Sequence, residues 1–453
     1  MKIEDIVKMA DKYRPTILET ERIVWKTPEP GYREWKTSEY MAAKFKEFGY
    51  RIIKAGNIPG FYAEADTGRK GPCVCVLAEM DSLIVPEHPE CDSETGAVHA
   101  CGHNAQCASV VGAAAVFSNA EALAGLCGKI RFVIVPAEEM IELEYRRKLL
   151  EEGTVKFFTG KPEFMSRGFF DGVDMAFMGH ASSKPQKSSV EVYPGNNGCI
   201  TKTVIYTGKS AHAGGAPQNG INALNSALLG LQAVNSIRET FNEKNYIRVN
   251  AVIKSGGAAC NAIPDYAVSE IMVRCADTES LEKINRKINR ALACGAAAVG
   301  AGITIDDVMT YSPLINSKEL NLLVGKCADD LSEIKDVIFN DEWDTGSSDV
   351  GSLSAVMPVC HFYSGGSSGG THCKDFCITH PEELCVNTAK LYSAIITRLL
   401  SDNGGLAEVI KSEYKPEFES ISDYLIYLDK CSSRFNAVKY NDDGSVKILQ
   451  SAE

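Results

Sequence analysis

The sequence predicts an α/β domain, built on a mostly parallel sheet covered by helices, with an inserted α+β domain of the ferredoxin-like type. In the first 180 residues, and again after residue 311, apolar runs of strand length alternate with helical segments, as in a parallel sheet buried on both faces. Between residues 197 and 310 a predicted strand alternates polar and apolar side chains, which is typical of a half-exposed strand. The predicted domains are therefore residues 1–196, 197–310 and 311–453, of which the third completes the first and ends in a polar extension.

The elements of the α/β domain follow from local signals. The segment 3–25 has the apolar period of an amphipathic helix, and the segment 39–48 forms a second one that Gly49 ends. Nearly uninterrupted apolar runs predict buried strands, and Pro381 opens a last helix. The predicted helices are 3–25, 39–48, 106–117 and 381–400, and the predicted strands are 72–80, 129–137, 173–179 and 356–363.

The inserted domain has a recognisable order of elements. A strand and a long helix come first, two strands follow, and a second helix and a last strand complete the segment. This β-α-β-β-α-β order is that of ferredoxin-like domains. The predicted strands are 201–206, 248–254, 266–275 and 303–309, and the predicted helices are 219–241 and 280–299.

Composition and charge exclude several classes of function. The chain has 453 residues, and its 47 Lys+Arg against 59 Asp+Glu give a net charge of −12, which argues against nucleic-acid or membrane partners. The longest apolar stretch, residues 291–303, is shorter than the ~20 residues that a membrane span requires. No apolar signal-peptide region follows Met1, and the 16 cysteines are scattered singly, as in a reducing compartment. We therefore expect a cytoplasmic globular protein.

Metal-ligating and acidic side chains follow the predicted strands of the α/β domain. Ligands of parallel sheets bind beyond the carboxyl ends of the strands, which meet at one edge. The chain has only eight histidines, so three histidines at such positions favour a metal site over coincidence. The residues just past the strands, or in the loop that follows, are Asp81, Cys101, His103, Glu138, Glu139, His180 and His372.

Each of these signals also has a purely structural interpretation. A Cys-x-His pair in a loop is usually no site, and His372 in a glycine-rich loop could simply lie on the surface. His180 could be a hydrogen-bonded histidine at a strand end. Adjacent glutamates are usually solvated, but this pair follows an uncharged run, residues 132–137, which favours a cleft. Taken together, the signals at one sheet edge favour a metal centre.

The chemistry of a metal centre explains why these residue types are needed. Residues two apart in an extended loop point the same way, so Cys101 and His103 can face one cation, and a thiolate can bridge two. Two cations about 3.5–4 Å apart can polarise a carbonyl group and lower the pKa of a water molecule. One glutamate of the pair would be a ligand and the other would take a proton from that water. Asp81 would accept a hydrogen bond from a ligand imidazole and fix its tautomer.

The chain resembles the amidohydrolase branch of the aminoacylase/carboxypeptidase G superfamily of co-catalytic metallopeptidases (metallopeptidase family 20). That branch includes hippuricases, auxin-conjugate hydrolases and p-aminobenzoyl-glutamate hydrolases. The resemblance covers most of the chain and implies a Zn-exopeptidase-like catalytic domain with an inserted lid or dimerisation domain. The motifs that carry it are residues 27–34, 79–81, 99–103, 137–139, 178–180, 210–213, 217, 220–224, 256–257, 261–265, 348–351 and 371–372.

The resemblance implies roles for individual residues. It implies two divalent metal ions, with Glu138 as the general base, and a homodimer formed through the inserted domain. His212 of that domain would reach the partner subunit's active site and stabilise the oxyanion, and Asn261 is a second candidate for this task. Arg274 would grip a substrate carboxylate, or is only an exposed arginine at a strand end. The implied metal ligands are Cys101, His103, Glu139, His180 and His372, a mixed donor set that admits Zn or Mn and also Co or Ni.

Some residues depart from the pattern of this branch. Asn104 and Gln106 stand where many relatives have aspartate and histidine, and Glu79 stands where many have aspartate. The stretch between Glu139 and His180 is also longer than in the hippuricase-like members. Because of these departures the sequence does not determine which substrate is cleaved, but the expected metal ligands are unaffected.

The sequence thus predicts a metal-dependent hydrolase that cleaves the amide bond of an N-acyl amino acid, such as a p-aminobenzoyl-glutamate-like conjugate. A metallo-dipeptidase or aminopeptidase of the same family is the closest alternative. A catalytically silent metal-binding homologue and a thiol-based redox sensor are alternatives from other classes.

Overall fold

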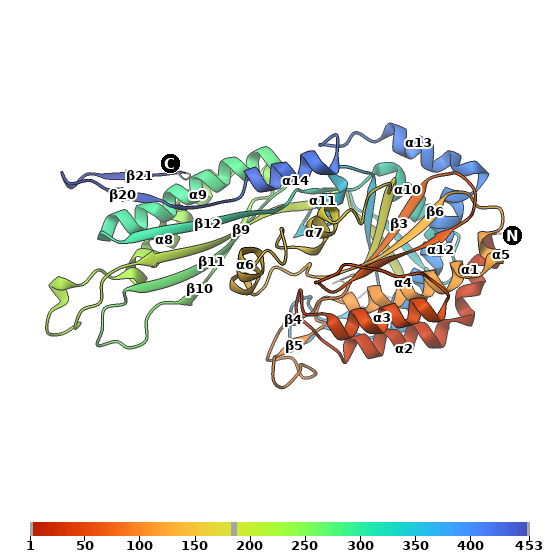
Figure 1. Cartoon of the computed structure of the whole chain (residues 1–453), viewed down its shortest axis with the longest axis horizontal. Coiled ribbons are helices and arrows are strands. Elements are labelled where there is room, and N and C mark those ends of the chain that lie inside the picture. The colour runs from red at the N-terminus through yellow and green to blue at the C-terminus, as the bar shows by residue number, and fades with distance from the viewer. Residues whose placement is uncertain (1–2, 183–187, 451–453) are drawn as a thin grey trace. The chain divides into compact units, whose positions relative to one another are not determined.

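The computed structural model of the chain describes residues 3–182 and 188–450 (Figure 1). Its contacts divide the chain into two compact units. The first unit contains the chain up to Gly195 together with Leu314–Asp344 and Ser352–Ser422. The second contains Asn196–Pro313, Thr345–Gly351 and the chain from Asp423 on.

An eight-stranded sheet forms the centre of the first unit, with the order β1-β2-β6-β3-β7-β16-β8-β14. The four central strands, β6, β3, β7 and β16, pair in parallel, whereas β1, β2 and β8 add antiparallel pairings beside them. Every residue of β3 is buried, which explains its continuous apolar sequence. The strands in spatial order are Ile53–Lys54, Phe61–Asp66, Lys129–Val135, Cys73–Glu79, Met175–Ala181, Val359–Ser364, Ser189–Val192 and Asp336–Phe339.

Helix α4 (His103–Phe117) is buried along its whole length because its small side chains let neighbours approach closely. It packs against β3 and β7, and helices α2 (Arg14–Trp25) and α12 (Asn387–Leu400) pack on it in turn. A Cβ atom on Gly112 would lie only 2.6 Å from the Cβ of Ala389 in α12. The first residue of α4 is a predicted metal ligand, so this packing holds one end of the expected site.

The remaining elements of the first unit are short or lie at its edges. Further helices are α1 (Ile3–Lys12), α3 (Trp35–Glu47), α5 (Ala120–Leu123), α6 (Leu143–Glu151), α7 (Gly160–Ser166), α10 (Lys318–Asp329) and α13 (Gly405–Glu413). Two-stranded ribbons are β4 (Leu83–Ile84) with β5 (Ala97–Val98), and β17 (Ser367–Ser368) with β18 (Cys377–Ile378).

The predicted fold class is confirmed, and the differences are local. The predicted helix 3–25 is two helices, because Tyr13 leaves the helical conformation and Pro15 starts the next helix. The predicted helix 381–400 begins with a π-helical turn, Glu382–Val386. Strands β2, β8 and β14 were not predicted, because each is short and lacks the long apolar run of a central strand.

The second unit contains a sheet of order β10-β11-β9-β12-β19, in which all neighbours are antiparallel. Helices α8 and α9 pack against each other and against this sheet. The chain order of the first six elements is the predicted β-α-β-β-α-β. They are β9 (Gly195–Thr207), α8 (Ala223–Ile237), β10 (Arg248–Ser255), β11 (Tyr266–Cys275), α9 (Thr278–Val299) and β12 (Gly302–Tyr311).

The end of the chain differs from the predicted boundaries, which place all of 311–453 in the α/β domain. In the structure, β19 (Ser433–Asn436) pairs with β12 and extends the sheet of the second unit. The Tyr424 hydroxyl accepts a hydrogen bond of 3.1 Å from the backbone of Ser312 in the same unit. The segment is mostly polar, so no apolar run revealed this strand. Helix α14 (Ile421–Lys430) precedes β19, and the hairpin β20 (Val438–Tyr440) and β21 (Val446–Ile448) follows it.

Within residues 3–182 and 188–450, no helix combines the length and the apolar character needed to cross a lipid bilayer.

Candidate metal centre

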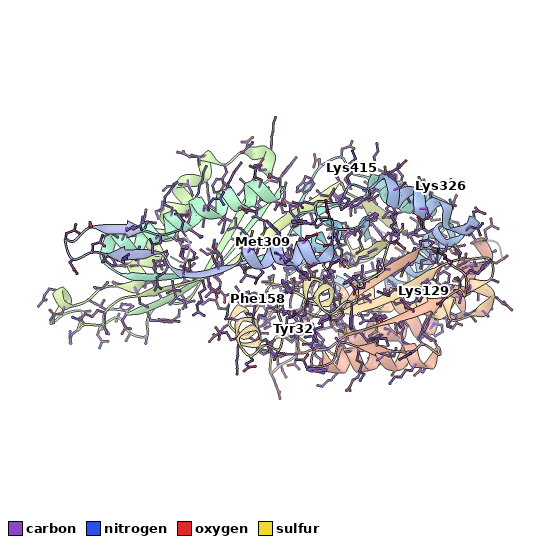
Figure 2. All side chains as sticks on the ribbon, turned by 45° about the horizontal axis from the view of Figure 1, so that its top comes forward. Tyr32, Lys129, Phe158, Met309, Lys326 and Lys415 are labelled. Atoms are coloured by element: carbon purple, nitrogen blue, oxygen red, sulfur yellow. The ribbon has the colours of Figure 1, made fainter. Side chains whose placement is uncertain are left out.

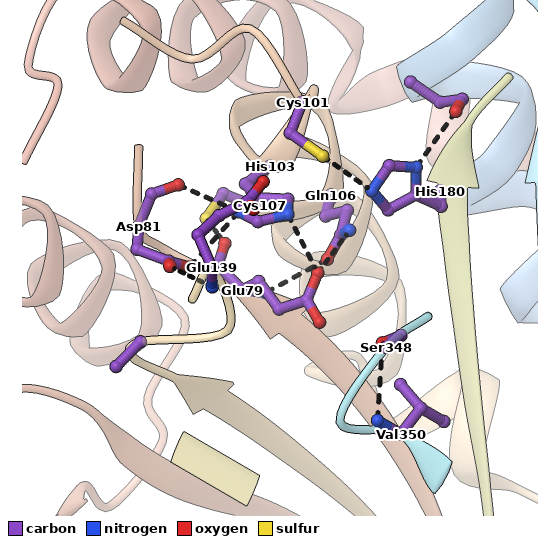
Figure 3. A network of polar contacts seen from close by, with 12 residues as sticks. Glu79, Asp81, Cys101, His103, Gln106, Cys107, Glu139, His180, Ser348 and Val350 are labelled. Atoms are coloured by element: carbon purple, nitrogen blue, oxygen red, sulfur yellow. Dashed lines mark hydrogen bonds and ion pairs between the residues drawn. The ribbon is translucent and has the colours of Figure 1, made fainter. Parts of the chain in front are cut away.

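The predicted ligands come from four separate parts of the first unit. Cys101 and His103 flank Gly102 at the start of α4, His180 lies near the end of β7, and Glu139 follows β6. Gly102 has a left-handed φ of 86°, and a Cβ atom there would lie 2.7 Å from the Cβ of Ala181. This position therefore requires glycine, which lets the thiol and the imidazole on either side reach the same space. Figure 3 shows their side chains converging.

His372 completes the cluster from the loop between β17 and β18, where its backbone N–H donates to the Ala100 carbonyl at 2.8 Å. Its Nε2 lies 3.2 Å from Oε1 of Glu139, and Sγ of Cys101 lies 3.4 Å from Nε2 of His180. The ligand atoms within each of three groups lie within 4.8 Å of one another. The groups are Cys101, His103 and His180; Cys101, Glu139 and His372; and His103, Glu138 and Glu139.

The donor atoms fit divalent cations. Cys101 belongs to two of these groups, so its sulfur would lie near a cation bound at either one. His103 Nε2 and Glu139 Oε1 are buried and form no hydrogen bond, although buried polar atoms normally do; they lie in ion-pair contacts instead, 3.1 Å from Glu79 Oε2 and 3.2 Å from His372 Nε2. A cation would satisfy both atoms. Thiolate, imidazole and carboxylate together suit zinc, and imidazole and carboxylate also suit manganese.

Asp81 connects two residues of the cluster. His103 Nδ1 lies 2.8 Å from the Asp81 carbonyl oxygen and 3.2 Å from Oδ1 of its side chain. The other carboxylate oxygen accepts a 2.7 Å hydrogen bond from the backbone N–H of Glu139. Asp81 therefore orients the His103 ring, so that Nε2 faces the cluster, and holds the Glu139 backbone at the same time.

Glu79, Gln106 and Lys161 form a buried network that sequence reasoning did not identify. Glu79 Oε2 lies 3.1 Å from His103 Nε2 and accepts a 2.8 Å hydrogen bond from the Gln106 side chain, which in turn accepts one from the Glu79 backbone (Figure 3). The Lys161 ammonium, which is fully buried, donates to the other Glu79 oxygen. In the sequence, Glu79 and Gln106 stand out only as departures from the family pattern. Nothing in the sequence around Lys161 indicates that this lysine is buried.

The charged groups of the cluster shift one another's pKa values. Burial and the nearby Glu139 carboxylate raise the pKa of the Cys101 thiol, but the surrounding imidazoles outweigh both and lower it to about 6. Burial also raises the pKa of Glu139, and His372 lowers it to about 2. Glu139 in turn raises the pKa of His372 to about 12. In the metal-free protein the carboxylate and the thiol are thus anionic near neutral pH and the His372 imidazole is protonated, so a cation that binds at His372 displaces its proton.

The other predicted residues lie in the second unit and are not part of this cluster. Nδ1 of His212 accepts hydrogen bonds from the N–H groups of Gly214 and Gly215, at 3.2 and 2.9 Å, so the proton of the neutral ring is on Nε2. The Asn261 carbonyl oxygen accepts a 3.0 Å hydrogen bond from Ala213, which places Asn261 next to His212. Arg274, at the end of β11, donates from Nε to Ser347 Oγ at 2.9 Å.

Residues 75–398, which are most of the chain, match peptidase family M20/M25/M40. The chain belongs to this family. The predicted resemblance is therefore confirmed, and the M20 protein is a metallohydrolase that uses divalent metal ions.

Individual relatives of the M20 protein differ in what they act on. A Xaa-Arg dipeptidase of Mus musculus is 26% identical over 360 residues, which are 76% of this chain and 74% of the relative. An N-acetylcysteine deacetylase of Bacillus subtilis is 27% identical over 303 residues, 65% of this chain and 74% of the relative. The crystal structure of a dinuclear metal binding peptidase of Bacillus subtilis has a TM-score of 0.64 at 20% identity, covering 86% of this chain and 99% of that one. At this sequence identity, the crystal structure shows only that the two chains share a fold.

The depressed pKa of Cys101 predicts an acidic thiol in the metal-free M20 protein. The ultraviolet absorbance of one thiolate should appear with a midpoint near pH 6 and should be missing in Cys101→Ser. Other buried thiols do not interfere, because burial raises the pKa of Cys73 to about 11 and of Cys107 to about 12. Below the midpoint the thiol holds a proton that competes with a cation, so metal affinity measured by calorimetry should fall as the pH drops through 6. A midpoint near that of an ordinary thiol would contradict the described arrangement of imidazoles.

Proposed function

We propose that this M20 enzyme hydrolyses the amide bond of N-acyl amino acids, with p-aminobenzoyl-glutamate-like and other acyl-amino-acid conjugates as the substrate class. Two divalent cations, Zn or Mn, bind at Cys101, His103, Glu139, His180 and His372. The observation that carries the proposal is the convergence of these donors at one sheet edge with the Glu138 carboxylate beside them. The N-acetylcysteine deacetylase among the relatives supports the choice of an N-acyl substrate.

Glu138 is the general base. Divalent cations bound here supply Lewis acidity, which polarises the scissile carbonyl and makes a water molecule easier to deprotonate. The Glu138 carboxylate lies within 4.8 Å of the ligand atoms of His103 and Glu139 and is only 9% exposed. From there it takes the proton of the attacking water and delivers it to the leaving nitrogen. Asp81 keeps the His103 ring and the Glu139 backbone in place during these proton transfers.

His212 donates a hydrogen bond to the developing oxyanion across a homodimer. Its Nδ1 is occupied by two backbone N–H groups, so Nε2–H is the ring's donor in the neutral form. Asn261, which is adjacent, assists it, and Arg274 binds the substrate carboxylate. The homodimer forms through the second unit, where the edge strand β10 exposes Val252 and Ile253. An exposed apolar strand edge is suited to pairing with another chain.

All 16 cysteines lie in described residues, and all are free thiols. Free thiols in this number are typical of a reducing compartment, which supports a cytoplasmic location.

A metallo-dipeptidase is the second candidate function, because the Xaa-Arg dipeptidase is also among the relatives. A panel of substrates distinguishes the two. With Mn or Zn supplied, N-acetyl, N-benzoyl and p-aminobenzoyl amino acids should give kcat/KM values at least about tenfold above those of free dipeptides, including dipeptides that end in arginine. The opposite ranking would favour the dipeptidase. A filled metal centre that hydrolyses none of these compounds would contradict both functions and favour a silent homologue.

Glu138→Gln should abolish turnover without loss of metal. The amide cannot accept the proton, so kcat should fall by about 10²–10⁴-fold, while the metal content measured by atomic absorption stays at the wild-type value. Glu144→Gln, an exposed position in the following helix, is the matched control and should keep full activity. Loss of metal from Glu138→Gln would reassign this residue as a ligand.

His212→Ala should lower kcat by about 10²–10³-fold and change KM little, because the lost hydrogen bond acts on the transition state. Mixing this variant with Glu138→Gln tests whether His212 acts on the partner subunit. Each mixed dimer then contains one site with both functional residues, so about a quarter of wild-type activity should return after random exchange of subunits. Mixtures that stay inactive would contradict action across the dimer.

A further inference from the structure

The backbone segment that carries the general base and a metal ligand has an unusual conformation. Ala137 lies directly before Glu138 and has a φ of 58°, in the left-handed region that alanine rarely adopts. The peptide groups of residues 137 and 139 are buried and cannot bond to water. The conformation therefore depends on the protein groups that bind these peptides.

Two carboxyl groups bind the N–H groups of this segment. Glu34 Oε1 accepts a hydrogen bond of 2.7 Å from the N–H of Ala137, and Asp81 Oδ2 accepts one of 2.7 Å from the N–H of Glu139. Both acids are fully buried. The N–H groups of the residues before and after Glu138 are thus both bound by buried carboxyl groups.

A single guanidinium binds the carbonyl groups of the same segment. Arg146, which lies in α6 and is 1% exposed, donates to the carbonyl oxygen of Ala137 at 3.1 Å and also to that of Glu139. It donates further to the carbonyl oxygens of Ile141 at 3.1 Å and Phe158 at 2.5 Å. Its donors thus go mainly to main-chain carbonyls, with the Met140 sulfur at 3.7 Å as a weaker contact.

The residues around Arg146 pack closely against its guanidinium group. A Cβ atom on Gly31 would lie 2.6 Å from Nη2 of Arg146 and 2.9 Å from the Cα of Ala137, so only glycine allows this approach. The guanidinium carbon lies 5.7 Å from the centre of the Tyr32 ring, and Figure 2 labels Tyr32 and also Phe158, whose carbonyl oxygen accepts from Arg146. The turn that contains Gly31 and Tyr32 therefore helps to hold the guanidinium against the base-bearing segment.

We propose that Arg146 is a positioning residue that fixes the Ala137–Glu139 backbone, and through it the placement of the Glu138 and Glu139 side chains. The proposal rests on the proposed function for the role of Glu138, but the backbone restraint itself needs no metal. A planar guanidinium has five N–H donors in fixed directions, and four carbonyl groups in different directions use them here. A lysine has three donors on one nitrogen and cannot reach the same set.

Arg146→Lys tests the proposal because it keeps the positive charge but removes the planar guanidinium and its set of donors. Hydrogen–deuterium exchange of the metal-free protein should show at least about tenfold faster exchange of the Ala137 and Glu139 amides, with α9 unchanged. In the metal-loaded enzyme kcat should fall by about 10–100-fold while KM stays within about twofold. Lys148→Met, which removes an exposed cation from the same helix, is the control and should match the wild type in both measurements.

A second variant keeps the test decisive if Arg146→Lys fails to fold. Gly31→Ala places a Cβ atom against Nη2 and should speed exchange of the same two amides. Unchanged exchange of these amides in folded variants, with kcat per folded molecule also unchanged, would overturn the proposal and leave Arg146 a purely structural residue. If the wild-type enzyme hydrolyses none of the substrates on the panel, the proposed function fails, yet the exchange experiment still decides the positioning role.

Discussion

Asp81 is the residue on which the metal centre depends. Its backbone carbonyl oxygen lies 2.8 Å from Nδ1 of His103, and its carboxylate accepts a hydrogen bond from the backbone of Glu139, so it joins the loop after β3 to α4 and to the segment after β6. Because these three parts are far apart in the chain, no local interaction could set the distance between the two ligands. One buried residue sets it, and the burial makes each of its hydrogen bonds stronger than it would be in water.

Burying so many charged groups at one sheet edge requires compensation. A buried ion without a partner is strongly destabilising, and two of the buried acids here have a partner of opposite charge. Lys161 balances Glu79, and the imidazole of His372 balances Glu139. Two residues that depart from the expected pattern, Glu79 and Gln106, contact each other: Glu79 Oε2 lies 3.1 Å from His103 Nε2, and the Gln106 amide donates to the same oxygen. These two departures thus belong to one hydrogen-bonded network.

The backbone restraint by Arg146 complements this balance of charge. In the proposed function Glu138 and Glu139, which are adjacent in sequence, perform different tasks, so their side chains need separate orientations. The left-handed Ala137 turns the chain sharply before the pair, and the buried acceptors and donors around it keep that turn. The stretch between Glu139 and His180 supplies both Arg146, which binds the base-bearing segment, and Lys161, which binds Glu79.

The parallel central strands, the β-α-β-β-α-β order of the second unit and the residues that meet at the sheet edge could be predicted from the sequence alone. Continuous apolar runs and metal-ligating side chains at strand ends are local patterns, so they could be read without coordinates. The pairing of β19 with the second unit, the burial of Lys161 and the contact of Arg146 with the Ala137 carbonyl emerged only from the folded structure. A lysine or an arginine looks solvent-exposed in a sequence, because its burial depends on partners more than 60 residues away or on main-chain carbonyls that no residue type identifies.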